Sequence, residues 1–310
     1  MKKTIIAKKI TCFILAIITL IALLPTTAMA AGDNIAADIE RVYMEAKRAA
    51  GLNSFSGWCG AYVGHQLKVM GINKTFIGSN GNQAFDTYKG QKKTTGDFYI
   101  DAYPASTYSL KQALNKISDN GSKTVRNILV GFEKGAGEDG ARFGHAVVIH
   151  QIGGGTVWFS ESFGVNLNGK YYPEGSPISC SIQQFCAYYG SWTVYEGLIH
   201  FKTYMDLCEF YPSVRQVQVR KSTTFKSLPC SRGTASESGD IRKARNGEIV
   251  TVIGLFRNSV NNYWYAVKVD GKLCYLFAGD AARLNDRLPD NQYDSTTGYN
   301  LYKGNKLLVK

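Results

Sequence analysis

Hydrophobic positions in the first part of the chain recur at helical spacing. In residues 35–50 (IAADIERVYMEAKRAA), the apolar positions that share one face are Ile39, Val42, Tyr43 and Ala46. A repeat of three to four residues indicates an amphipathic helix, and Gly51 is a natural stop for it. We therefore predict a helix over residues 35–50.

A second helix is predicted over residues 59–70 (CGAYVGHQLKVM), between the polar turn 53–57 and Gly71. Residues 73–105 are polar and contain scattered glycines, so we expect them to be irregular. Residues 110–118 again carry apolar positions at helical spacing and predict a short third helix.

From Arg126 onward the pattern changes to that of strands. Apolar runs predict strands at 127–132, 145–152, 156–162 and 194–201. A glycine-rich loop, residues 133–142, precedes the second of these strands. The triplet Gly153-Gly154-Gly155 indicates a hairpin turn between the second and the third. Helices followed by antiparallel strands argue for an α+β domain over residues 31–201.

The last third of the chain has an all-β pattern. We interpret residues 202–213 as a linker, residues 214–284 as a second domain, and residues 285–310 as a polar tail. Strands are predicted at 214–220, 248–256, 263–269 and 272–278, and Asp270-Gly271 is a hairpin signal. Several short strands in about 70 residues suggest a small barrel.

The N-terminus has the organisation of an export signal. Lysines at positions 2, 3, 8 and 9 precede an apolar run over residues 10–24, and a small-x-small cleavage site follows at Ala28-Met29-Ala30. The run is shorter than the roughly 20 apolar residues that a spanning helix needs. We predict a signal peptide over residues 1–30 and a secreted mature chain; an uncleaved anchor is the alternative. No later segment is expected to span a membrane.

Composition limits the classes of function. The chain has 310 residues, of which 45% are hydrophobic and 19% charged, so wholesale disorder is excluded. Its net charge is +12, and loss of the four N-terminal lysines leaves 32 basic against 24 acidic side chains. This excess favours an anionic partner, although ordinary solubility is an equal explanation. Nucleic acid is not expected, because the basic residues are scattered and the chain is exported.

Export allows disulfides to form. Cys12 leaves with the signal, and six cysteines remain: Cys59, Cys180, Cys186, Cys208, Cys230 and Cys274. They contain no Cys-x-x-Cys pair, so a zinc ribbon or a thioredoxin-type site has no support. We expect no metal and no organic cofactor. The even count permits three bridges, or one reactive thiol beside an incompletely paired set, and the pairing of Cys180, Cys186 and Cys208 stays open.

The stretch GWCGAYV, residues 57–63, is the most informative for chemistry. It places Cys59 between a glycine turn and the first turn of a predicted helix. A helix N-terminus carries unpaired N–H groups and a partial positive charge, which favour the thiolate, the nucleophilic form of cysteine. The same N–H groups can bind a developing oxyanion. The alternative is a buried structural cysteine.

A histidine, His145, begins the apolar strand HAVVI after a glycine-rich loop. Such an imidazole can take the proton of a thiol and return it to a leaving group; a structural histidine is the alternative. The other histidines compete poorly. His150 lies at an odd offset, on the opposite face of the sheet. His65 points away from Cys59 around the helix, and His200 has no distinctive context.

Glu161 is a single charge at the end of the apolar strand TVWFSES. Beside His145 it would orient the ring and stabilise the imidazolium, as the third member of a triad does. A solvated strand end is the alternative. The placement depends on the register of one hairpin, because a slip of one residue would replace Glu161 with a serine.

These three segments resemble motifs of the papain-like cysteine hydrolases of bacterial cell walls, the CHAP and NlpC/P60 groups. WCGAYV resembles the CHAP-type Trp-Cys-x-x-Tyr/Phe-Val element, FGHAVVIHQI its Gly-His strand, and TVWFSES the strand that supplies a glutamate. Over residues 35–200 the resemblance implies a papain-like domain with Cys59, His145 and Glu161 as catalytic residues. Family members often have an asparagine two residues after the glutamate, where this chain has Phe163. The segment between Cys59 and His145 is also long.

The C-terminal strands resemble a bacterial SH3-like domain. The resemblance lies in residues 220–229, in GEIVTVIGLF and in YWYAVKVDGKLCYLFA. Such domains commonly hold cell-wall hydrolases on the wall, so the resemblance implies a wall-binding barrel. Cys230 and Cys274 lie within it, and we predict a bridge between them because secreted cysteines in one small domain often pair.

The sequence thus predicts a secreted, wall-associated peptidoglycan hydrolase, an amidase or endopeptidase. Its partner would be peptidoglycan or another anionic wall polymer. Two alternatives stay open. One is a non-catalytic wall-binding or adhesion protein on the same scaffold, because fold analogy does not by itself grant function. The other is a secreted cysteine protease or acyl transferase that acts on proteins.

Overall fold

The computed structural model describes residues 34–74, 81–133, 144–230 and 238–283. The predicted signal peptide and polar tail, and nearly all of the loop 133–142, lie outside these ranges. No helix in the described ranges is long and apolar enough to cross a membrane. The chain divides into two compact units, one of residues up to Lys92 with Ile100–Phe201, the other of Lys93–Tyr99 with residues from Lys202 onward.

The first unit is an α+β structure built on a six-stranded sheet with the order β1-β8-β2-β3-β4-β7. Its strands are β1 (Tyr99–Pro104), β2 (Val125–Glu133), β3 (His145–Gly153), β4 (Thr156–Phe159), β7 (Ile178–Ser181) and β8 (Val194–Lys202). The pairings of β2 with β3 and β8, and of β4 with β3 and β7, are antiparallel. A separate two-stranded sheet joins β5 (Val165–Leu167) and β6 (Lys170–Tyr172).

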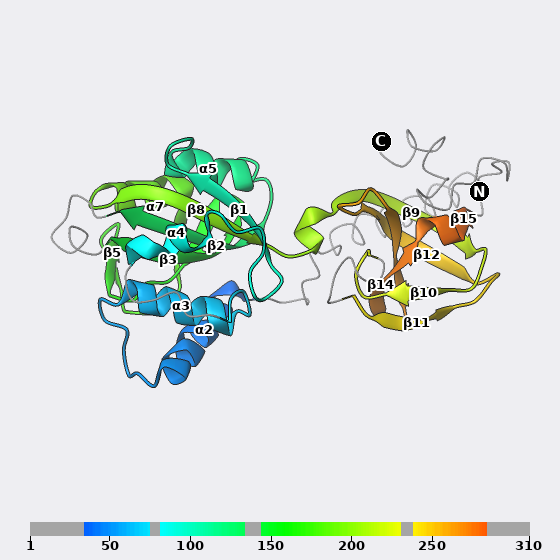
Figure 1. Cartoon of the computed structure of the whole chain (residues 1–310), viewed down its shortest axis with the longest axis horizontal. Coiled ribbons are helices and arrows are strands. Elements are labelled where there is room, and N and C mark those ends of the chain that lie inside the picture. Colours follow the sequence, from blue (N-terminus) through cyan, green and yellow to red (C-terminus); the bar gives the residue numbers. More distant parts are fainter. Residues whose placement is uncertain (1–33, 75–80, 134–143, 231–237, 284–310) are drawn as a thin grey trace, which may run out of the picture. The chain divides into compact units, whose positions relative to one another are not determined.

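Helices cover both faces of this sheet. Figure 1 shows α5 (Leu110–Ile117) and α7 (Ile182–Gly190) on one face, with α2 (Ile35–Ala50) and α3 (Cys59–Val69) on the other. The central strands are therefore buried on both sides, which explains the continuous apolar run at the start of β3. The strands predicted at 127–132, 145–152 and 194–201 are confirmed.

The predicted helices are confirmed, and their ends follow local chemistry. The side chain of Asn34 accepts hydrogen bonds at the N-terminus of α2, and Gly51 ends that helix in the left-handed conformation. Ser109 and Gln112 form a capping box at the start of α5. These ends were predictable because each depends on a few neighbouring residues.

The prediction that residues 73–105 are irregular is wrong. The described part of this segment forms a 3₁₀ turn, η1 (Gly81–Gln83), a short helix, α4 (Ala84–Tyr88), and the edge strand β1. Tertiary contacts hold the segment. The Tyr88 ring packs edge-on against Phe201 at 5.1 Å, and its hydroxyl accepts a 2.6 Å hydrogen bond from Asn73. Elements this short carry too few turns for their periodicity to be recognised.

The hairpin after β3 turns at Gly154-Gly155, two residues of the predicted triplet, whereas Gly153 ends the strand and pairs with Thr156. The returning strand β4 is shorter than the expected 156–162, because it ends at Phe159. Glu161 therefore lies just beyond the strand. Its backbone carbonyl accepts a hydrogen bond from the Gly175 amide at 2.8 Å.

The second unit holds a seven-stranded sheet with the order β11-β10-β14-β13-β12-β9-β15. Its strands are β9 (Glu209–Val219), β10 (Thr223–Lys226), β11 (Asp240–Ala244), β12 (Ile249–Arg257), β13 (Tyr263–Val269), β14 (Lys272–Phe277) and β15 (Ala281–Arg283). The pairings describe a sheet that is open between β11 and β15 in the described residues. Asp270-Gly271 forms the predicted turn, with both residues at positive φ.

Part of the expected linker 202–213 is regular structure. Met205–Leu207 form a 3₁₀ turn, η2, and β9 begins at Glu209. Strand β9 pairs with β12 from Glu209 to Gln218 and so belongs to the sheet along nearly its whole length. Pro212, a residue type that is rare inside strands, stands near the start of β9 and concealed it from the pattern.

All six cysteines in the described residues are free thiols, so the bridge predicted between Cys230 and Cys274 is absent from the structure. The two side chains belong to different hydrophobic clusters. Cys274 lies in the core of the seven-stranded sheet, whereas Cys230 packs with Tyr204 and Cys208. Membership in one small domain did not bring the two thiols into one cluster.

Candidate active site

Cys59 is the first residue of α3 and is 8% exposed. The residue before it, Trp58, makes no side-chain capping bond to the helix. By contrast, α2, α5 and α7 each have a capping side chain. In the described residues, no side chain therefore caps the N-terminus of α3, which carries the thiol. The N–H groups and the partial positive charge there favour a negative charge at this point.

The loop before Cys59 is held by a glutamate that the sequence did not single out. Glu174 Oε1 accepts from the Phe55 amide at 2.6 Å and from the Tyr43 hydroxyl at 3.0 Å, and Oε2 accepts from the Ser54 hydroxyl. One carboxylate therefore joins α2 to the loop that leads to Cys59.

The other side of that loop is tied to the segment after β4. The Gly57 amide donates to the Ser162 carbonyl at 3.3 Å. Since Glu161 is the neighbour of Ser162, this bond joins the approach to Cys59 directly to the segment that carries Glu161. The positions of the thiol and the carboxylate are consequently coupled through the backbone.

His145 is the first residue of β3 and lies between the two other predicted residues. Its Nε2 is 3.0 Å from Glu161 Oε1, and the Cys59 side chain is near enough to the ring to raise the His145 pKa. Because Nε2 faces the carboxylate, Nδ1 is the nitrogen that remains for the thiol. The structure thus brings Cys59, His145 and Glu161 together in one line of contacts.

The His145 pKa is set by two opposing effects. Burial lowers it, because a charged imidazole is poorly solvated there. The negative charge of Glu161 and the hydrogen bonds with Cys59 and Glu161 outweigh burial and raise the pKa to about 10. The imidazolium form is therefore favoured at neutral pH.

Aromatic rings surround the His145–Glu161 pair. The imidazole lies 5.1 Å from Trp192, 5.5 Å from Phe163, 5.8 Å from Tyr189 and 6.0 Å from Phe132, measured between ring centroids. Both members of the pair are nearly inaccessible, with Glu161 only 1% exposed. The surroundings exclude water and strengthen the interaction between the charges.

Tyr189 of α7 belongs to no sequence motif, but its hydroxyl donates a hydrogen bond to Glu161 Oε1. No local signal marks this contact. The two residues are separated by 28 positions, and α7 lies outside every motif. Phe163, which stands where an asparagine was expected, packs against the His145 ring instead.

The other histidines are not part of this group. His150 packs toward α3, where its Nε2 lies 3.1 Å from Gln66 Nε2, and Gln66 also contacts Ser160. Burial lowers the His150 pKa to about 4, so this ring is neutral at pH 7. In the described part of the chain, no group of three or more His, Cys, Asp or Glu side chains is arranged to hold a metal ion.

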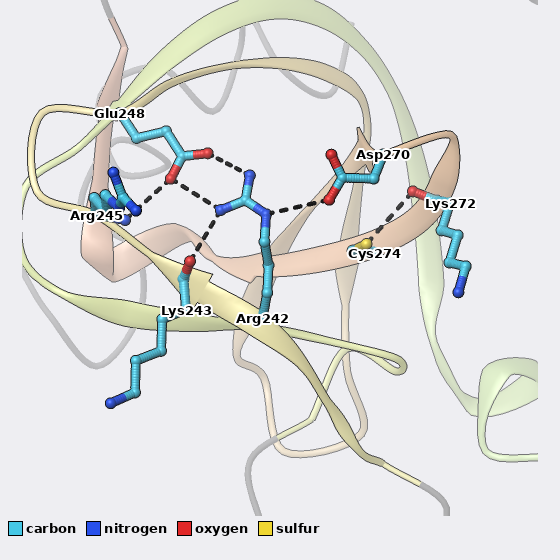
Figure 2. Close-up of polar contacts among 7 residues, drawn as sticks. All are labelled: Arg242, Lys243, Arg245, Glu248, Asp270, Lys272 and Cys274. Carbon is cyan, nitrogen blue, oxygen red and sulfur yellow. Dashed lines mark hydrogen bonds and ion pairs between the residues drawn. The ribbon is translucent and has the colours of Figure 1, made fainter.

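A second cluster of charges lies on the other unit (Figure 2). Arg242 binds Glu248 through two nitrogens, at 2.6 and 3.2 Å, and its Nε lies 3.7 Å from Asp270. Glu248 also accepts from the Arg245 amide at 3.0 Å. This cluster contains no nucleophile in contact with a base, and Asp270 is largely exposed. It is a surface ion-pair network.

Comparisons with known proteins add little to this description. No family model matches the chain, and no curated protein matches it. The solved structures that align with it include "The crystal structure of Ly7917 with the hydrolyzing product of MDP" and "The crystal structure of Ly7917". Each is 13% identical, with a TM-score of 0.26, over 81% of this chain and 95% of the other. This distant likeness carries no weight for fold or function.

Proposed function

We propose that this chain is a secreted peptidoglycan hydrolase that cleaves an amide bond through Cys59. The observation that carries the proposal is the line of contacts from an uncapped helix N-terminus, through the Cys59 thiol and the His145 imidazole, to the buried Glu161 carboxylate. A buried histidine with a raised pKa that lies between a thiol and a carboxylate is typical of nucleophilic catalysis.

In the proposed reaction, the Cys59 thiolate attacks the carbonyl carbon of the amide. The N–H groups at the start of α3 stabilise the oxyanion that forms. The His145 imidazolium then gives its proton to the leaving nitrogen, the C–N bond breaks, and a thioester remains on Cys59. Neutral His145 next takes a proton from water, whose oxygen attacks the thioester. Collapse of the tetrahedral intermediate breaks the C–S bond, releases the carboxylic acid and leaves Cys59 as the thiolate beside the protonated His145.

Glu161 has an electrostatic role in this scheme. Its charge keeps the His145 ring oriented and stabilises the imidazolium while the thiolate is negative. Removal of the Glu161 charge takes away the carboxylate that lies 3.0 Å from the His145 ring and stabilises the buried cation.

The proposed enzyme has a catalytic domain and a wall-binding domain. The helices and the antiparallel sheet of residues 31–201 support a papain-like catalytic domain, and the strands of residues 214–284 support an SH3-like domain that holds the enzyme on the wall. The excess of basic residues suits an anionic wall polymer. Export through the signal at residues 1–30 would deliver the enzyme to that substrate.

The test is digestion of purified peptidoglycan by the mature chain, followed by mass spectrometry of the released fragments. We expect fragments from the wild type and from Cys186→Ala, a control that removes another partly buried thiol of the same unit. Cys59→Ala should release none. If the wild type releases no fragments but still binds the wall, the proposal is overturned in favour of a wall-binding protein. If it neither releases fragments nor binds the wall, the search moves to protein substrates.

A further inference from the structure

The Tyr189 hydroxyl and the His145 imidazole meet at one oxygen atom. Glu161 Oε1 accepts from Tyr189 and lies 3.0 Å from His145 Nε2. All three side chains are buried, so no water competes for that oxygen from an open surface. A buried carboxylate needs several donors, because each unused lone pair costs desolvation energy. Tyr189 supplies the second donor.

The phenol is suited to remain a donor throughout a catalytic cycle. Burial, together with the neighbouring negative charge of Glu161, raises the pKa of Tyr189 well above its usual value. The hydroxyl therefore keeps its proton at neutral pH. Unlike a water molecule, it is also fixed to the scaffold.

The backbone of Tyr189 is held in several ways. Helix α7 begins with a capping box formed by Ser181 and Gln184, and the Thr193 hydroxyl donates to the Tyr189 carbonyl at 2.7 Å. The Tyr189 ring stacks on Phe132 at 4.9 Å with an interplanar angle of 17°. The helix and this stack set the position of the hydroxyl before any substrate binds.

We propose that Tyr189 is a positioning residue of the Cys59 site: its O–H fixes the Glu161 carboxylate, which in turn holds the His145 ring with Nδ1 toward the thiol. Tyr189 also lies along the His145 ring, at 5.8 Å and 19°, so one side chain limits both the carboxylate and the imidazole. The inference rests on the proposed function of this site and deepens it. Tyr189 on α7 thus supplies a polar contact to the site. Phe163, which stands where family members often have an asparagine, cannot supply one.

The variant Tyr189→Phe removes the hydroxyl and keeps the ring. The matched control is Tyr195→Phe, which loses a phenol hydrogen bond of the same kind, 2.6 Å to the Tyr103 carbonyl, away from Glu161. With peptidoglycan as substrate, we expect Tyr189→Phe to lower kcat about 10-fold, in the range found when supporting hydrogen bonds are removed from a site. KM should stay within about two-fold, and Tyr195→Phe should match the wild type.

Two further measurements separate positioning from a general loss of structure. The ¹⁵N resonances of the His145 ring should move in Tyr189→Phe and stay in place in Tyr195→Phe. Adding Tyr189→Phe to Glu161→Gln should cause little further loss of kcat, because residues that act through one another are not additive. Additive losses, or unchanged kcat and His145 resonances in Tyr189→Phe, would overturn the inference.

The test remains informative if the chain does not digest peptidoglycan. In that case the proposed substrate fails, but the rate at which iodoacetamide alkylates Cys59, together with the His145 resonances, still reports on the geometry of the pair. A lower alkylation rate in Tyr189→Phe than in Tyr195→Phe would support positioning by Tyr189. Equal rates with unmoved resonances would refute it.

Discussion

Each of the two units contains a cation paired with a carboxylate, but the two pairs differ in their exposure to solvent. In the first unit, His145 and Glu161 are 5% and 1% exposed, and aromatic rings surround them. In the second unit, Arg242 joins Glu248 to Asp270, and the Asp270 side chain is 84% exposed. Figure 2 shows the lysine ammonium groups of that region outside the ion-paired network.

The difference between them is solvent. Water and salt screen the interactions of Arg242, so an exposed pair of this kind contributes roughly 0.2–1 kcal/mol. Around His145, burial opposes the charge, and only Glu161 and Cys59 keep the imidazolium stable. The attraction between a cation and a carboxylate contributes little to stability at the surface. In a dry site it determines the protonation state of the proposed catalytic histidine.

The largest effect should follow from neutralising the buried carboxylate. Glu161→Gln keeps the side-chain shape but removes the charge beside His145, so the imidazolium loses its main support. We expect peptidoglycan digestion to fall by up to about 10⁴-fold, the scale found for the third member of another triad. The matched surface variant, Glu248→Gln, should digest at the wild-type rate. Equal rates for the two variants would show that the buried carboxylate is no more important for digestion than the exposed one.

A smaller loss should follow from removing Glu174. Glu174→Ala leaves the Phe55 amide and the Tyr43 hydroxyl without their shared acceptor, and the free energy of unfolding should fall by about 2 kcal/mol. Urea denaturation measures the change. Hydrogen exchange at the Phe55 amide should also accelerate. The control is Glu45→Ala, which removes an exposed carboxylate paired with Arg41; a loss as large as that of Glu174→Ala would contradict the prediction.

The histidines of β3 should give opposite pH dependences. Burial keeps the folded His150 pKa at about 4, below the ordinary 6.5, so the unfolded chain binds a proton there that the folded chain does not. Stability is therefore lost as pH falls from 6.5 toward 4, by at most about 1.4 kcal/mol per pH unit for one proton. The contribution of His145 is complete below pH 6.5 and is lost as pH rises through about 10.

Urea denaturation of the wild type and His150→Gln at several pH values checks this prediction. The variant should have a flatter decline between pH 6.5 and 4, because the group that gains a proton on unfolding is gone. An unchanged slope would mean that carboxylates alone cause the acid dependence. The alkaline decline should be present in both proteins, since His145 is untouched.

The smallest effect is expected at the surface. Arg242→Ala removes both ion pairs and the contact of the guanidinium with the Phe225 ring, 4.7 Å from its centroid. We expect a loss of stability of about 1 kcal/mol or less, and most of the ionic part should vanish in 0.5–1 M salt, where the Debye length is only about 3–4 Å. Thermal denaturation at low and high salt measures it. A larger loss that is insensitive to salt would mark the ring contact as the main contribution.

Local signals in the sequence determined the helices 35–50 and 59–70, the turns at Gly154-Gly155 and Asp270-Gly271, and the candidate residues themselves. Each depends on periodicity, on a cap or on the conformational preference of a few neighbouring residues, all of which are readable along the chain. The motif resemblance selected Cys59, His145 and Glu161 before any distance between them was known.

Only the tertiary structure decided how those residues meet and what supports them. Tyr189 and Glu174 lie 28 and 119 positions from partners that they bind, Glu161 and Phe55. No local pattern encodes contacts at such separations. The same is true of the cysteines: the sequence paired Cys230 with Cys274, whereas packing placed the two thiols in different clusters. Burial, which keeps His150 neutral and strengthens the attraction between His145 and Glu161, arises only when distant elements pack together and exclude water.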